Sequence, residues 1–201
     1  MIERLDGRAQ SIDRKLALHF ISFGAKQIPS DDGFATLLDE CEKLVLDAQS
    51  LSAVYGIYDI ALGQPLDLGF ATVNSRDLER SLEGCDKIIL FAATAGIGID
   101  RLILKYGRLS PSKAAVIQAA GAALVERWCD EICLGFTKRY GANAFRYSCG
   151  FGDLPLTLQR DIFTALDLER TLGMRLSDNC LMTPSKSVTA IVGIKNGYHN
   201  G

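Results

Sequence analysis

The sequence predicts an α+β fold. Three observations point to this class: strand-like runs lie on either side of a turn at 63–65, helical periodicity is confined to separate stretches, and strands do not alternate regularly with helices. The chain of 201 residues, 48% of them hydrophobic, is long enough to bury one substantial core. We therefore expect a single domain over residues 1–201, with a helical part over 1–50 and an α+β core over 51–201.

Two helices are expected in the N-terminal part. Apolar residues recur at helical spacing over Ile12 to Phe23 and over Phe34 to Ala48, and the turn-forming residues 29–33 separate the two stretches. The charged residues from Glu3 to Lys15 are expected to belong to the first of these helices. This part therefore reads as a helical hairpin.

Strands and helices are mixed in the rest of the chain. Leu51 to Ala61 carries alternating aromatic and β-branched residues and is expected to pair with Leu68 to Val73, which follows the turn. Further strands are expected over Lys87 to Ala93, Arg175 to Leu181 and Ser187 to Ile194. Further helices are expected over Ser75 to Leu82, Asp100 to Lys105, the alanine-rich Pro111 to Tyr140, and Thr157 to Leu172, the last ending at Gly173.

Charge and composition argue against several classes of partner. The net charge of -2, with basic residues scattered among acids, gives no footprint for nucleic acid. The most apolar run, Ile88 to Ile99, falls well short of the ~20 residues that cross a bilayer, and no signal peptide is expected. Six cysteines without a Cys-x-x-Cys motif fit a reducing cytoplasm.

The segment from Arg146 to Asp153 is the strongest candidate for a binding loop. A guanidinium in a short irregular link can fork a carboxylate, and Gly150, four residues later, lets backbone approach the same ligand. The adjacent ring of Phe151 can cover an apolar or cationic surface. The segment therefore predicts binding of a ligand with several different functional groups.

This loop and its flanks resemble the activation, or reactivation, domain of vitamin B12-dependent methionine synthase. The signature of that family reads Arg-x-x-x-Gly-Tyr before a helix and Met-x-Pro-x-x-Ser-Val after it. The matching positions here are Arg146, Gly150, Met182, Pro184, Ser187 and Val188, with Phe151 in place of the tyrosine. Between them, Leu166 to Ser177 is similar to the helix, Gly-Met turn and strand entry of the family.

The resemblance implies an activation-domain-like fold, with an antiparallel or mixed sheet and flanking helices, that binds S-adenosylmethionine. The residues expected at the site are Arg146, Ser148, Cys149, Gly150, Phe151, Gly152, Met182, Pro184, Lys186 and Ser187. In the family, an oxidatively inactivated cobalamin is rescued by one electron from a flavodoxin- or ferredoxin-like donor and a methyl group from S-adenosylmethionine. The protein itself is expected to supply a shaped pocket, with no catalytic acid or base and no metal ligand.

The chain has no room for the modules that bind homocysteine, folate or cobalamin. We therefore expect a free-standing reactivation subunit of a methyltransferase, acting in trans on the cobalamin-binding module of methionine synthase, which carries the cobalamin. One alternative is a corrinoid- or S-adenosylmethionine-binding regulatory module for another methyltransferase. The other is a non-catalytic assembly subunit.

Other patterns in the sequence allow a functional and a structural interpretation. The glycine-containing turn from Thr94 to Asp100 could hold a phosphate, but we favour a tight strand-to-helix turn. Cys129 and Cys133 could share a metal, although core packing is favoured in so alanine-rich a helix. Cys149 could serve redox chemistry beside a corrin. An acid of the long helix, Glu126 or Asp130, could face the pocket or solvent.

Overall fold

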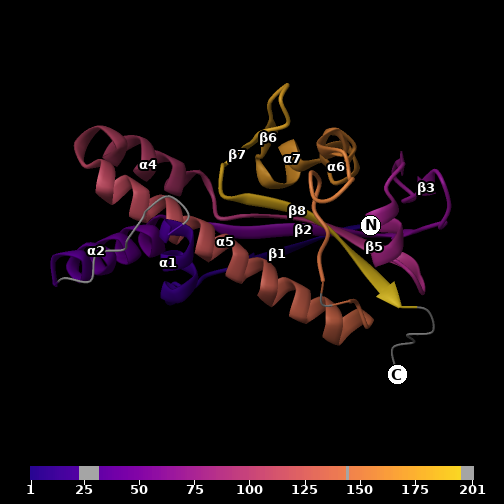
Figure 1. Cartoon of the computed structure of the whole chain (residues 1–201), viewed down its shortest axis with the longest axis horizontal. Helices are drawn as coiled ribbons and strands as arrows, with labels where there is room; N and C mark the ends of the chain where they lie inside the picture. Colours follow the sequence, from indigo (N-terminus) through magenta and orange to yellow (C-terminus); the bar gives the residue numbers. More distant parts are fainter. Residues whose placement is uncertain (23–31, 144, 196–201) are drawn as a thin grey trace.

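The computed structural model describes residues 1–22, 32–143 and 145–195 (Figure 1). Within these residues, four antiparallel strands form one sheet in the order β1-β2-β5-β8. The strands are β1 (Ile2–Gly7), β2 (Leu51–Asp59), β5 (Cys85–Thr94) and β8 (Ser187–Lys195). Helices flank the sheet, so the fold is α+β with an antiparallel sheet, and the predicted fold class is confirmed.

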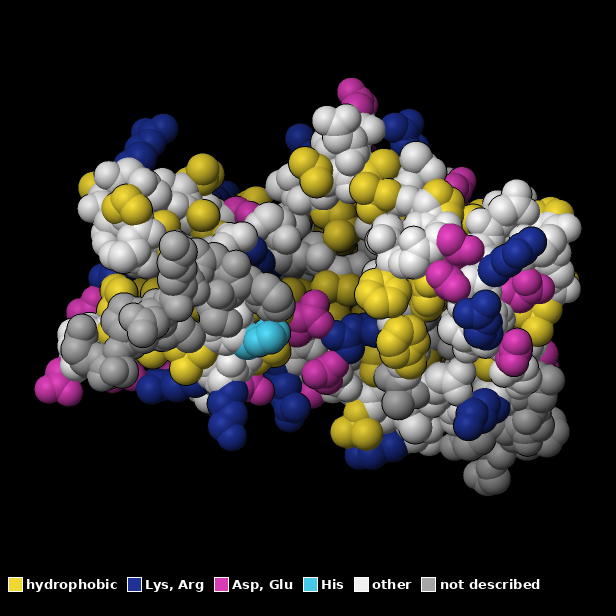
Figure 2. Space-filling view, in the orientation of Figure 1, with side chains coloured by type: hydrophobic (Ala, Val, Ile, Leu, Met, Phe, Trp, Pro, Cys, Tyr) yellow, Lys and Arg dark blue, Asp and Glu magenta, His cyan; other side chains and the backbone are white. Residues whose placement is uncertain are grey.

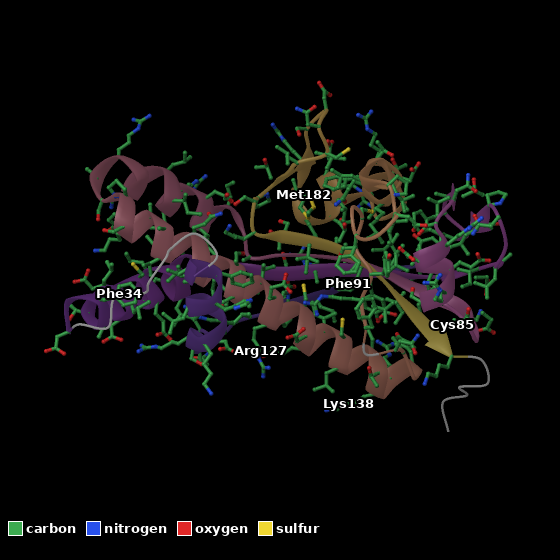
Figure 3. All side chains as sticks on the ribbon, viewed as in Figure 1. Phe34, Cys85, Phe91, Arg127, Lys138 and Met182 are labelled. Atoms are coloured by element: carbon green, nitrogen blue, oxygen red, sulfur yellow. The ribbon has the colours of Figure 1, made fainter. Side chains whose placement is uncertain are left out.

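Strand β5, one of the two central strands, is buried on both faces because its apolar residues alternate between two cores. Ile89, Phe91 and Ala93 belong to one hydrophobic cluster, whereas Ile88 and Leu90 belong to the other. Successive side chains of a strand point to opposite faces, so an uninterrupted apolar run supplies both cores. Figure 3 places the labelled Phe91 near the centre of the sheet.

Longer helices cover the face of Phe91. They are α1 (Arg14–Ser22), α2 (Asp32–Ala48), α4 (Ile97–Leu109) and α5 (Pro111–Tyr140). Helix α5 has the bounds that the sequence predicts: Pro111 opens it, and Gly141 closes it with a left-handed φ of 63°. Its buried alanines belong to the hydrophobic cluster that α5 shares with the other helices and the sheet, while Arg127 and Lys138 lie on its outer side (Figure 3).

Shorter elements cover the opposite face. They are α3 (Arg76–Ser81), η1 (Leu156–Leu158), α6 (Gln159–Ala165), α7 (Leu168–Leu172), the hairpin of β3 (Leu66–Asp67) with β4 (Thr72–Val73), and the hairpin of β6 (Arg175–Leu176) with β7 (Met182–Thr183). Their buried side chains form the second core with Ile88 and Leu90. The helix predicted over Ser75 to Leu82 is thus present as α3, and the Ser75 hydroxyl caps it.

Two predictions for the first half of the chain are wrong. The residues from Ile2 to Gly7 form strand β1 instead of helix, because Leu5 packs against the helical core while its neighbours stay more exposed at the sheet edge. Strand β2 pairs with β1 and β5 rather than with Leu68 to Val73. The latter segment instead turns back on itself as part of the β3–β4 hairpin.

Two predictions for the second half are also corrected. The helix expected over Thr157 to Leu172 begins as η1, continues as α6 and is interrupted before α7, because Asp167 adopts a left-handed φ of 49°. The strand expected over Arg175 to Leu181 stops at Leu176, where a turn containing Cys180, with a φ of 59°, reverses the chain into β7. The turn expected over 29–33 and the polar tail after Lys195 lie largely outside the described residues.

In the described part of the chain, no helix combines the length and the apolar character that crossing a membrane requires.

Candidate functional site

The predicted binding loop is anchored to the edge of the sheet. The backbone N–H of Tyr147 donates to the carbonyl of Ile191 in β8 at 2.8 Å, and the Ile191 N–H returns a bond of the same length. Beyond this bridge, the Gly150 N–H donates to the Leu154 carbonyl at 2.9 Å. The sheet therefore fixes where the loop begins, and the bond within the loop fixes its shape.

Gly152 is required by the shape of this loop. Its φ is +53°, and a Cβ built on it would lie 2.5 Å from the Tyr147 hydroxyl oxygen and 2.6 Å from Asp77 Oδ2. Both the backbone conformation and the lack of space disfavour any side chain here. The packing of the loop on α3 therefore explains why a glycine occupies this position.

Asp153 ties the end of the loop to α3. Its carboxylate accepts hydrogen bonds from the Ser75 hydroxyl and from the backbone N–H of Arg76, the latter at 2.8 Å. The Ser75 bond, followed by the backbone bonds at the helix start, holds the pKa of Asp153 below its ordinary value. The loop is therefore clamped between β8 at one end and the start of α3 at the other.

Arg146 is already paired within the protein. Its guanidinium donates to the carboxylates of Glu126 and Asp130, both on α5, and its side chain is only 20% exposed. Burial alone would lower the pKa of Arg146, but the hydrogen bond that it donates to Asp130 and the nearby acidic groups outweigh burial and raise the pKa. The three side chains carry a net charge of about -1.

The loop borders a groove of about 660 Å³. Figure 2 shows a hollow at the centre of this face, below the β6–β7 hairpin, with hydrophobic side chains on its floor. The lining residues are Glu126, Ser148, Cys149, Leu156, Gln159, Cys180, Leu181, Met182, Thr183, Ser185, Ser187, Val188 and Thr189. Two segments that the sequence singled out, one around Cys149 and one around Met182, therefore meet at one groove.

The structure brings together only part of the predicted site. Four of the predicted residues, Ser148, Cys149, Met182 and Ser187, line the groove, and Met182 lies above strand β8 in Figure 3. Arg146 reaches the groove through its partner Glu126. The remaining predicted residues, Gly150, Phe151, Gly152, Pro184 and Lys186, are not part of the lining.

The predicted residues outside the lining include one exposed ring and one buried lysine. The Phe151 ring is exposed and packs edge-on against Tyr147, with ring centroids 5.5 Å apart. Lys186 is buried, and its aliphatic stem runs close to Gly121 of α5. Burial lowers the pKa of Lys186.

The turn before β8 is held by residues of the neighbouring strand-to-helix connection. The Ser185 N–H donates to the Asp100 carboxylate at 3.1 Å, and the Ser187 hydroxyl donates to the Thr94 hydroxyl at 2.8 Å. A Cβ on Gly98 would lie 2.3 Å from the Ala48 carbonyl oxygen. The segment from Thr94 to Asp100 is therefore a tightly packed turn that supports the groove, in agreement with the structural interpretation of its glycines.

Sequence reasoning missed Gln159, Cys180 and Thr189, and it left the direction of Glu126 open. Among the described residues, Glu126 is the single charged side chain of the groove lining. Gln159 and Thr189 are both buried, and the Thr189 hydroxyl donates to Gln159 Oε1 at 2.9 Å. No motif marks these positions; the only usable signal for Glu126 is its place on α5 beside two small buried cysteines.

The cysteines divide between core and groove. Cys129 and Cys133 are buried in the helical core, in line with the interpretation that favours packing over a metal. In the described part of the chain, no group of three or more His, Cys, Asp or Glu side chains could hold a metal ion. Burial, reinforced by Cys180, raises the pKa of Cys149 to about 12, so its thiol stays protonated at neutral pH.

A smaller cavity of about 280 Å³ lies between β1 and α5. Its lining includes Leu5, Tyr55, Trp128 and Phe136, and it contains none of the residues predicted for the site. The groove beside β8 is therefore the better candidate.

Comparisons of the sequence with protein-family models and with curated proteins found no match. Among solved structures, the fold is similar to the crystal structure of the MetH reactivation domain bound to AdoHcy, with a TM-score of 0.68 and 14% sequence identity. The match covers 100% of this chain and 80% of that one. At this identity the likeness establishes a shared fold, which is the fold that the sequence resemblance implies.

Proposed function

We propose that the groove binds S-adenosylmethionine and that this chain acts as a free-standing reactivation subunit of cobalamin-dependent methionine synthase. The observation that carries the proposal is the meeting of the Ser148–Cys149 loop and the Met182–Ser187 segment at one groove that contains a single charged side chain, Glu126. The solved structure with the same fold is bound to AdoHcy, which differs from S-adenosylmethionine by one methyl group and its positive charge.

The groove suits a ligand that carries positive charge close to an apolar body. S-adenosylmethionine carries a positive sulfonium and ammonium, and a carboxylate held at the wall of a partly apolar groove attracts both. Arg146 orients Glu126 from behind by a charge-assisted hydrogen bond. Hydroxyl groups of Ser148, Thr183 and Ser185 along the lining provide hydrogen-bonding groups for the ribose and the amino acid part.

In this proposal Arg146 acts through Glu126, rather than by forking the ligand carboxylate as the sequence suggests. Its guanidinium already makes hydrogen bonds to two carboxylates, and a third anion would compete with both of them. Arg146 is therefore a positioning residue. The ligand carboxylate would instead meet the uncharged donors of the groove.

The partner's cobalamin supplies the methyl-accepting metal centre in this proposal. The chain supplies the seat that holds the methyl donor, converting an encounter between two separately bound molecules into a local one. The electron comes from a flavodoxin- or ferredoxin-like donor in the cytoplasm. The contact with the partner is transient, because other substrates must reach the same metal.

The first test is calorimetric titration of S-adenosylmethionine and of AdoHcy into the purified chain. We expect both to bind, with the cationic ligand favoured, and we expect Glu126→Gln to remove that preference. Glu131→Gln is the matched control, because Glu131 is an exposed acid of the same helix that lies outside the groove. Absence of binding by either ligand to the wild-type chain would refute the proposal.

The second test adds a methionine synthase cobalamin module loaded with cob(II)alamin, together with a reduced flavodoxin. The expected result is transfer of the labelled methyl group of S-adenosylmethionine to the cobalamin, dependent on this chain. Ligand binding without methyl transfer would support the regulatory alternative. If S-adenosylmethionine neither binds nor donates its methyl group, the remaining alternative is a non-catalytic assembly subunit.

A further inference from the structure

The most constrained polar side chain in the groove belongs to Gln159. It lies at the start of α6, is only 5% exposed, and forms part of the groove lining. The Thr189 hydroxyl of strand β8, itself 2% exposed, donates to Gln159 Oε1 at 2.9 Å. An interaction between residues 30 positions apart in the sequence thus fixes the orientation of the carboxamide.

This arrangement leaves the amide nitrogen without a partner. A carboxamide has two N–H donors on its nitrogen, and Gln159 Nε2 makes no hydrogen bond to any described residue, whereas its oxygen is satisfied. Among the described residues, the side-chain nitrogen or oxygen that is both fully buried and without a hydrogen-bond partner is Trp128 Nε1, not Gln159 Nε2. Gln159 Nε2 is therefore open to the groove and presents its donors there.

The surroundings of this donor favour a flat ring with an acceptor atom. Leu156, Val188 and the thioether of Met182 line the same groove, and thioether sulfur makes favourable contacts with aromatic rings. Glu126, the charged group of the lining, comes from α5, whereas Gln159 comes from α6 on the other core. A ligand with a cationic part and a heteroaromatic part can use both groups.

We propose that Gln159 determines specificity for the base of the ligand by donating from Nε2 to a ring nitrogen, with Thr189 as the residue that positions it. The inference rests on the proposed function, because it takes the ligand to carry an adenine. Adenine offers ring nitrogens N1, N3 and N7 as acceptors. The donor therefore selects a base with an acceptor at one of these places.

The test compares AdoHcy with its 1-deaza, 3-deaza and 7-deaza analogues by calorimetry. Each analogue replaces one ring nitrogen with a C–H group and so removes one acceptor. The wild-type chain is expected to bind one of the three about five- to tenfold more weakly than AdoHcy, the size of one neutral hydrogen bond. Gln159→Leu is expected to weaken AdoHcy binding by a similar factor and to show no additional loss with that analogue.

The control for this substitution is Gln118→Leu. Gln118 is an exposed glutamine of α5 that lies outside the groove, so its replacement makes the same chemical change without touching the site. AdoHcy affinity is expected to remain that of the wild type. Circular dichroism of all variants shows whether each one is folded.

Thr189 is tested through rescue. Thr189→Val keeps the shape of the side chain but loses the hydroxyl that holds the carboxamide, and AdoHcy binding is expected to fall about two- to fivefold. Thr189→Ser restores the hydroxyl and is expected to recover most of the wild-type affinity. A purely structural role would instead make both variants differ from the wild type in thermal midpoint and leave their affinities unchanged.

The inference about Gln159 is refuted, and the proposed function stands, if the wild-type chain binds AdoHcy but Gln159→Leu binds it equally well. The same conclusion follows if the loss of affinity with each deaza analogue, relative to AdoHcy, is the same in Gln159→Leu as in the wild type. If the wild-type chain binds neither AdoHcy nor S-adenosylmethionine, the proposed function and this inference are both overturned.

Discussion

The Arg146 guanidinium donates a hydrogen bond to the Glu126 carboxylate and holds it at the wall of the groove beside β8. The two residues come from different elements, the irregular segment before β8 and the long helix α5. The other terminal nitrogen of the guanidinium donates a hydrogen bond to Asp130. This cluster connects the loop that the sequence marks to the helix that forms the helical core.

Replacing Arg146 with alanine is expected to cost stability as well as ligand affinity. The substitution leaves Glu126 and Asp130, one turn apart on α5, as neighbouring carboxylates without their shared cation. We expect the free energy of unfolding in urea to fall by about 1 to 3 kcal/mol. Arg127→Ala is the control, because Arg127 and its partner Glu131 are both exposed, and a change within about 0.5 kcal/mol is expected. Equal losses for the two variants would contradict a structural role for the Arg146 cluster.

Replacing Gly152 with alanine tests the shape of the binding loop. The new Cβ would lie 2.5 Å from the Tyr147 hydroxyl in a backbone conformation with φ of +53°. We expect destabilisation of about 1 to 3 kcal/mol by thermal or urea unfolding. Gly107→Ala in α4 is the control, since a Cβ there meets nothing within 4 Å, and the gain in helix propensity is expected to stabilise by up to about 1 kcal/mol. The free energy of unfolding is therefore expected to fall in Gly152→Ala and to rise in Gly107→Ala.

The elements that were predicted correctly are those whose pattern is local. Helix α5 has an opening proline and a closing glycine, and β5 contains the uninterrupted apolar run from Ile88 to Ala93, so each is specified by its own residues. Strand β1 escaped detection because a six-residue edge strand with three charged side chains gains its stability from pairing with β2, which no local pattern records.

The site was predictable where it rests on a contiguous motif and not where it rests on a tertiary contact. Cys149 and Met182 belong to the two signature segments, and both line the groove. Gln159 and Thr189 matter because α6 and β8 are adjacent in space. The sequence marks Arg146 as a ligand contact, which stays a prediction, and it left open whether Glu126 or Asp130 faces the pocket; the structure shows both acids paired with Arg146.

Cys149 is expected to react slowly with alkylating reagents at neutral pH. Burial raises the pKa of its thiol to about 12, so the reactive thiolate is scarce, and its fraction grows as the pH rises toward that value. Peptide mapping after iodoacetamide treatment of the native chain, over a series of pH values, measures this directly. The same peptide in the unfolded chain is the control and should be modified at the rate of an ordinary thiol. Rapid labelling of native Cys149 at pH 7 would contradict the protonated state and revive a redox role.

The stability of the loop anchor is expected to depend on acid pH through Asp153. Hydrogen bonds from Ser75 and from the start of α3 hold the pKa of its carboxyl below the ordinary value of 3.8. Because the folded state favours the ionised form, this carboxylate stabilises the protein above about pH 3.8, and the contribution is lost as the pH falls through the lowered pKa. Asp153→Asn lacks a carboxylate, so its free energy of unfolding should fall below that of the wild type at neutral pH and converge with it in acid. Urea titrations from pH 7 to pH 2 measure the difference. Asp86→Asn serves as the control, because Asp86 is an exposed aspartate whose carboxylate accepts no hydrogen bond from any described residue. A wild-type advantage that stays constant down to pH 2 would show that the ionised carboxylate of Asp153 is not what anchors the loop to α3.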